Sequence, residues 1–145
     1  MPRNSKTILF IFTALALCSF ALGYLIWNKP HEDVLNADGM ATDAFSLYNS
    51  FTSDSSKAKI SFLNKIIKVS GVLQEVTANQ QKQQIIFLKS PVQGASVNCT
   101  MEQNCKNVKP GDKVVIKGIC SGFSGGIPEM NIPGDVLLVR CYPIK

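Results

Sequence analysis

The chain has 145 residues, among them 15 basic and 10 acidic side chains and five cysteines. Two of the basic residues precede a long uncharged stretch, which leaves residues 28–145 with 13 basic and 10 acidic side chains, a net charge of +3. This mild excess consists mostly of lysine, because Arg140 is the one arginine after that stretch. The composition therefore argues against a strongly basic polyanion-binding surface and favours one domain with a modest core.

Residues 7–27 are uncharged and mostly apolar. As a helix they would extend about 30 Å, the thickness of the hydrocarbon core of a bilayer. Tyr24 and Trp27 lie near the far end, where amphipathic rings favour the interface. Arg3 and Lys6 come before the stretch, so the positive-inside tendency places the N-terminus in the cytoplasm. The sequence predicts a single-pass transmembrane anchor with an extracytoplasmic domain.

Two alternatives to an uncleaved anchor are a cleaved signal peptide and a lipoprotein signal. The apolar region of a signal peptide ends at a small-x-small site, whereas residues 21–23 are followed by more apolar residues. Residues 15–18 loosely resemble a lipobox, but Leu17 occupies the position before Cys18 where a small residue is expected. We therefore expect an uncleaved anchor over residues 7–27, with residues 1–6 in the cytoplasm.

Residues 28–41 are polar and contain Pro30, and they predict a spacer between the anchor and the domain. Four apolar residues then recur at helical spacing, namely Ala44, Leu47, Tyr48 and Phe51. Thr42 is the expected N-cap of this helix, with Asp43 in its first turn. A second short helix is predicted from Ser53 or Asp54 to Leu63.

Five strands follow, predicted at residues 66–76, 85–88, 95–101, 110–120 and 136–142. Pro110 and Gly111 fit a type II turn that starts the fourth strand, and Gly118 interrupts that strand in the manner of a bulge. The pattern predicts a mainly β domain over residues 42–145, a five-stranded OB-type barrel preceded by two short helices. In this architecture residues 77–84 and the Gly-rich residues 121–134 form the loops that flank the binding face.

Several segments carry a family resemblance: NKPH at residues 28–31, KIIKVSGV at 65–72, GDKV at 111–114, KGICSG at 117–122 and DVLL at 135–138, with Cys141 after them. Together they are similar to the tRNA-anticodon-binding-like (tRNA_anti-like) OB-fold family of bacterial membrane-anchored envelope proteins. The resemblance implies an OB barrel and a bacterial source. With the orientation expected from the charges, the anchor would lie in the bacterial inner membrane and the domain would be periplasmic or otherwise extracytoplasmic. It supplies no catalytic residues to transfer to this chain.

Four cysteines follow the anchor, namely Cys99, Cys105, Cys120 and Cys141. An even number in an extracytoplasmic domain favours disulfides, and four cysteines allow three connectivities. Strands four and five are neighbours in an OB barrel, so we expect a Cys120–Cys141 disulfide, with Cys99–Cys105 closing the third strand onto its connector. The alternatives are buried reduced thiols and a four-thiolate zinc site, which the wide spacing disfavours.

Catalytic motifs are missing from the sequence. His31 is the one histidine and lies in the predicted spacer, without an acid or a nucleophile nearby. The chain has no Ser-His-Asp order, no HExxH motif and no phosphate loop. Asp112 and Asp135 adjoin turn glycines and are expected to serve as turn residues. We therefore predict neither an enzyme nor a cofactor or metal site.

The predicted function is a binding module for an envelope protein or glycan. The candidate contact residues are Phe87, Lys89, Phe123, Ile127, Arg140 and Tyr142. One alternative is a single-stranded nucleic-acid binder, which needs a basic groove and stacking aromatic side chains. Another is a structural subunit of a membrane complex that acts through its anchor helix. The few aromatic residues and the expected extracytoplasmic location favour the protein or glycan ligand.

Overall fold

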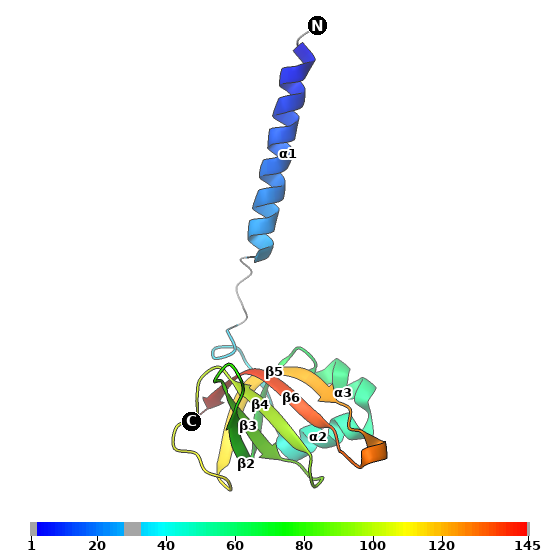
Figure 1. Cartoon of the computed structure of the whole chain (residues 1–145), viewed down its shortest axis with the longest axis vertical. Helices are drawn as coiled ribbons and strands as arrows, with labels where there is room; N and C mark the ends of the chain where they lie inside the picture. Colours follow the sequence, from blue (N-terminus) through cyan, green and yellow to red (C-terminus); the bar gives the residue numbers. More distant parts are fainter. Residues whose placement is uncertain (1–2, 28–32, 145) are drawn as a thin grey trace. The chain divides into compact units, whose positions relative to one another are not determined.

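The computed structural model describes residues 3–27 and 33–144, and the chain divides into two compact units, Met1–Asp33 and Val34–Lys145 (Figure 1). The first unit contains one helix, α1 (Arg3–Trp27). Its described large side chains are apolar and exposed, namely Ile11, Phe12, Leu15, Leu17, Phe20, Leu22 and Tyr24. Within the described part of the chain, no helix combines the length and the apolar character that crossing a membrane requires.

The second unit is mainly β, as predicted. Two helices, α2 (Ala44–Ser53) and α3 (Ser55–Phe62), precede five long strands: β2 (Ile66–Ala78), β3 (Gln84–Lys89), β4 (Ser96–Met101), β5 (Lys113–Ser124) and β6 (Asp135–Ile144). The strands pair in the order β2-β3-β4-β6-β5, and β5 returns to β2, which closes the barrel. The β4–β6 pair is parallel, whereas the other four barrel pairs are antiparallel. The predicted five-stranded OB-type barrel with two preceding helices is confirmed.

Aspartate caps determine where the two helices begin. The carboxylate of Asp43 accepts the backbone N–H of Ser46 at 3.0 Å, so α2 begins at Ala44 and the expected cap at Thr42 is wrong by one residue. Asp54 repeats the arrangement for α3 by accepting the N–H of Lys57 at 3.0 Å. Hydrogen bonding from Ser46 lowers the pKa of Asp43 below its usual value.

The folded unit begins earlier than the expected domain boundary at residue 42. A short strand, β1 (Met40–Asp43), pairs in parallel with β2 outside the barrel. Val34 is only 2% exposed, and the Lys117 ammonium donates to the carbonyl of Leu35 at 3.0 Å. Residues 34–41, which the sequence placed in a spacer, therefore pack against the barrel.

The core lies between α2 and the inner face of the barrel. The helix buries the four residues predicted from their spacing, Ala44, Leu47, Tyr48 and Phe51. The Phe51 ring lies 5.8 Å from the Phe123 ring in a stacked arrangement and 6.1 Å from the Phe62 ring. Gly71 lets the helix approach, since a Cβ there would lie 3.1 Å from the Ala44 Cβ.

The turn predicted before the fourth strand of the barrel is present, whereas the bulge expected at Gly118 is in the facing part of β6. Gly111 has a φ of +97°, and the N–H of Asp112 donates to the carbonyl of Lys109 at 3.0 Å, as a type II turn requires. The β5–β6 register shifts between Lys117 and Ile119, where Gly118 lies. β5 continues to Ser124, however, so the loop expected over residues 121–134 begins only at residue 125.

The predicted disulfides are wrong, because every described cysteine is a free thiol. The Cys141 thiol is hydrogen-bonded to Cys99 and not to Cys120, and this contact together with burial raises the pKa of Cys141. Cys120 lies opposite Leu138 in the β5–β6 pair, so it is displaced along β6 from Cys141. Cys105 forms no disulfide with Cys99. Its backbone N–H and carbonyl are hydrogen-bonded to the Gln84 side chain.

Candidate functional site

The loop of residues 125–134 joins β5 to β6 and has an ordered backbone. Ile127 and Ile132 form an antiparallel bridge, with N–H···O distances of 2.8 and 3.1 Å in the two directions. Between them lies a 3₁₀ helix, η1 (Pro128–Met130), which ends at Asn131 in the left-handed conformation. The bridge and the helical turn hold the loop in one conformation without burying its side chains.

Two glycines hold the base of this loop together. A Cβ on Gly126 would collide with the carbonyl oxygen of Ile132, and a Cβ on Gly134 would collide with the carbonyl oxygen of Ser124. Both contacts are backbone contacts, which cannot be relieved by rotating a side chain. Glycine is therefore required where the two ends of the loop meet.

The loop exposes large apolar side chains. Ile127 is 46% exposed, Met130 67% and Ile132 47%, and Val92 of the β3–β4 connector is 44% exposed. Beside them is a hollow of about 670 Å³, lined by Val92, Ile132, Tyr48, Phe123 and neighbouring residues. None of the described residues that line the hollow carries a charge, and Glu129 is the one charged residue in the loop sequence.

A hydrogen-bond network around Asp135 fixes the strand ends beneath the loop. The Asp135 carboxylate accepts from the backbone N–H of Ser96 at 2.7 Å and from its hydroxyl at 3.0 Å. The Ser124 hydroxyl bonds the backbone of Asp135 as donor at 3.2 Å and as acceptor at 3.1 Å. Burial and the Asp135 charge raise the pKa of the neighbouring Tyr48 phenol. Asp135, expected to be a turn residue, therefore joins the ends of three strands.

The second predicted binding loop is smaller and polar. β2 runs to Ala78 and β3 begins at Gln84, so only residues 79–83 of the expected 77–84 segment form a loop. The Asn79 side chain accepts from the N–H groups of Gln81 and Gln83 at 3.0 and 2.9 Å. This Asx-type turn is ordered but offers no large apolar side chain.

The six predicted contact residues lie on four different elements, namely the 125–134 loop, β5, β3 and β6. Ile127 is exposed on the 125–134 loop, whereas Phe123 packs against Phe51 and also against Tyr48, with ring centroids 5.9 Å apart. Phe87 and Lys89 are on β3, opposite Asn98 and Ser96 of β4. Arg140 and Tyr142 are near the end of β6.

Sequence reasoning missed a basic row on the outer face of the barrel. Lys68 of β2 pairs with Lys117 of β5, and Lys117 pairs with Tyr142 of β6. Arg140, two residues before Tyr142, has a φ of +53° at the β6 bulge. The alternation of lysines with buried residues in β2 and β5 indicated that they face outward, but it could not indicate that the strands would align them.

Within the described residues, no group of three histidine, cysteine or acidic side chains could hold a metal ion. The described features of this region are hydrogen-bonded loops and outward-facing side chains on a closed barrel.

Comparisons with known proteins identify the family of the chain. A solved structure described as a "putative nucleic acid-binding lipoprotein" from Klebsiella pneumoniae aligns with a TM-score of 0.46 and 17% sequence identity, over 81% of this chain and 100% of that chain. No curated protein matches. The tRNA_anti-like family model matches residues 3–132. The chain therefore belongs to the tRNA_anti-like family, as its sequence motifs predicted.

Proposed function

We propose that this chain is a non-enzymatic binding module that engages a protein partner through the 125–134 loop. The supporting observation is the exposure of Ile127, Met130 and Ile132 on a backbone held by its own bridge and two required glycines. Several large apolar side chains exposed together on one loop are typical of an interaction surface, whereas a single exposed apolar side chain is not. The adjoining hollow of about 670 Å³ can receive an apolar side chain of that partner.

The chemistry of this surface favours a protein over the other ligand classes. A nucleic acid needs cationic groups near its phosphates, and the described lining of the hollow has none. A glycan needs several polar groups directed at its hydroxyls, whereas the most exposed side chains here are aliphatic or thioether groups. Apolar side chains at the centre of a contact surface are typical of protein interfaces.

No described helix has the length and the apolar character of a membrane span, so the location of the module is a proposal that rests on the sequence alone. We propose that residues 7–27 anchor the chain in a bacterial inner membrane, with residues 28–145 in the periplasm, because that stretch is uncharged and Arg3 and Lys6 precede it. Extraction of native membranes with alkaline carbonate tests the anchor. Release of the chain into the soluble fraction would contradict it.

Crosslinking in the native cell tests the partner surface. A photo-activated residue at Met130 is expected to capture a protein, whereas the same residue at Ile60 is the matched control. Ile60 is also apolar and is 77% exposed, but it lies on α3. Equal capture from both positions, or capture of nucleic acid at Met130, would contradict the proposal. Capture only through α1 would favour a structural subunit of a membrane complex.

A second candidate function is single-stranded nucleic-acid binding, which the row of Lys68, Lys117 and Tyr142 favours. An oligonucleotide titration at several salt concentrations tests it. This function requires affinity that falls steeply with salt and a further loss on Lys68→Ala. Because the Lys117 ammonium already donates to the Leu35 carbonyl at 3.0 Å, the row is partly engaged within the chain. For this reason we favour the protein partner.

A further inference from the structure

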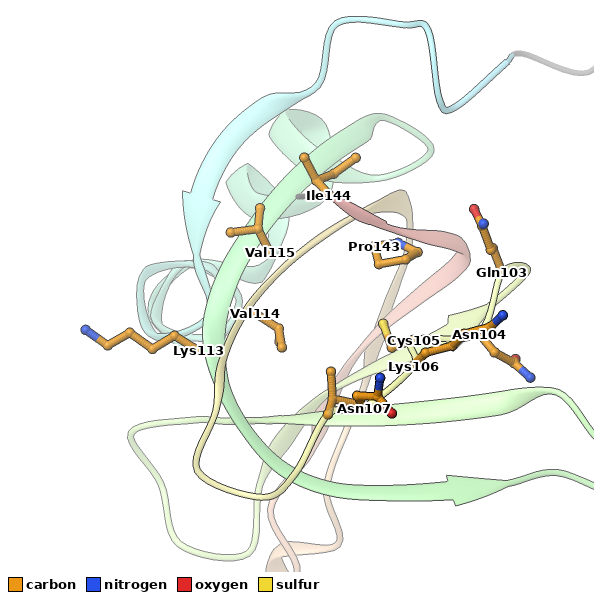
Figure 2. A pocket seen from close by; sticks show the side chains of 11 residues that line it. Gln103, Asn104, Cys105, Lys106, Asn107, Lys113, Val114, Val115, Pro143 and Ile144 are labelled. Atoms are coloured by element: carbon orange, nitrogen blue, oxygen red, sulfur yellow. The ribbon is translucent and has the colours of Figure 1, made fainter.

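A second cavity, of about 880 Å³, lies between the connector that follows β4, the start of β5 and the end of β6 (Figure 2). Its volume is within the range of roughly 300–1,000 Å³ that small-molecule sites occupy. Its described lining shares no residue with the hollow beside the 125–134 loop. The two sites can therefore be tested separately.

The wall of this cavity is held in place by hydrogen bonds. The Gln84 side chain accepts the N–H of Cys105 at 2.7 Å and donates to its carbonyl at 3.3 Å. One residue after β4, the N–H of Glu102 donates to the Cys141 carbonyl at 2.9 Å. These contacts tie the connector to β3 and β6.

The inner part of the cavity is apolar. Val108, Val114 and Cys105 line it and pack against the hydrophobic core, and Pro143 and Ile144 complete this side. Figure 2 shows the Cys105 sulfur and the Val114 side chain facing the same space. Burial, with a contribution from Cys99, raises the pKa of Cys105. The thiol therefore stays neutral near pH 7 and presents a small apolar group.

The rim of the cavity is polar and cationic. Gln103, Asn104 and Asn107 contribute amide groups, and Lys106 contributes an ammonium group. Lys113 also lines the cavity, although Figure 2 shows its chain extending away from the other labelled residues. No acidic side chain is among the described lining residues. Ammonium and amide N–H groups are donors that suit a carboxylate.

We propose that this cavity binds an unbranched aliphatic monocarboxylate, with the carboxylate at Lys106 and the rim amides and the chain against Val114 and Cys105. Charge complementarity selects the anionic head, because the described rim offers the Lys106 ammonium group and amides without an opposing carboxylate. The apolar interior selects the chain. This ligand class is inferred from the cavity lining alone, independently of the family and of the 125–134 loop.

The test uses the full-length chain in lipid nanodiscs and straight-chain alkanoates from butanoate to decanoate. The measurement is the rate at which N-ethylmaleimide modifies Cys105, followed by peptide mass spectrometry. Decanoate is expected to slow the modification severalfold, and affinity is expected to rise by up to about fourfold for each buried methylene. Lys106→Glu is expected to weaken protection by at least about tenfold.

Lys109→Glu is the matched control, because Lys109 is an exposed lysine on the same connector and outside the described lining. It is expected to leave protection unchanged, and thermal unfolding checks that both variants fold. Three outcomes would overturn the proposal: no protection of Cys105 by any alkanoate, equal protection in Lys106→Glu, or protection by decanol as strong as by decanoate.

Discussion

Gly118 is the glycine whose replacement tests the packing of the barrel most directly. It lies on β5 opposite the bulge of β6, at the position where the register shifts. A Cβ at Gly118 would lie 2.5 Å from the Cys141 Sγ and 3.2 Å from the Val139 carbonyl oxygen. Gly118 does not have a positive φ, so Gly118→Ala introduces a steric collision and not backbone strain.

The size of the effect follows from how little the sulfur can move. A carbon and a sulfur in ordinary contact are at least roughly 3.5 Å apart, so the Cys141 Sγ must move by about 1 Å. Cys141 is fully buried, and its thiol is already hydrogen-bonded to Cys99. Overpacking of a well-packed core costs about 1–3 kcal/mol. We expect Gly118→Ala to lower the free energy of unfolding by about 2 kcal/mol.

Urea unfolding of a double-mutant cycle measures this collision. Cys141→Ala removes the sulfur, so in that background Gly118→Ala is expected to cost at most half as much, a coupling of about 1 kcal/mol. Gly125→Ala is the control, because a Cβ there has no atom within 4 Å. The reasoning fails if Gly118→Ala costs the same with and without the Cys141 sulfur.

Two further predictions concern the helices. Phe51→Ala is expected to lower the free energy of unfolding by about 3–5 kcal/mol, since the ring is 1% exposed, whereas Ile60→Ala at a site 77% exposed should change it by less than about 0.5 kcal/mol in the same urea assay. Asp43→Ala removes the cap of α2 and should cost about 1 kcal/mol at pH 7. Because hydrogen bonding lowers the folded-state pKa of Asp43 below 3.8, the capping stability is present above that pH and lost as the pH falls through the folded-state pKa. The difference in the free energy of unfolding between Asp43→Ala and the parent chain should therefore be smaller below pH 3 than at pH 7. An equal difference at both pH values would contradict this account.

The parts of the fold that the sequence predicted are those with local physical causes. The turn at Pro110 and Gly111 depends on the conformations of two residues, and the pattern of α2 depends on a period of 3.6 residues. β1 was missed because a four-residue parallel strand has no turn beside it and too few residues to show a period. The bond between Ser96 and Asp135 joins positions 39 residues apart, so no local pattern could indicate it.

The bulges explain why the candidate contact residues do not share one face of the barrel. Cys120 faces the core, and strict alternation along β5 would direct Phe123 outward, toward a ligand. The register instead shifts between Cys120 and Gly122, where Gly122 has a φ of +136°. After that shift Phe123 lies opposite the buried Val136 and stacks on Phe51.

The bulge of β6 has the same kind of effect on Arg140, whose φ of +53° interrupts the alternation between Val139 and Cys141. One inserted residue changes the face to which every later side chain of a strand points. A sequence shows which residues are aromatic or cationic, but the inserted residue decides whether each one reaches the core or the surface. Gly122 can adopt the positive φ of a bulge, but a glycine alone does not cause one. The pairing of β5 with β6 that closes the barrel selects the bulge at this position. Choosing contact residues by type alone therefore works only on strands without such an insertion, and β2, β5 and β6 of this barrel each contain one.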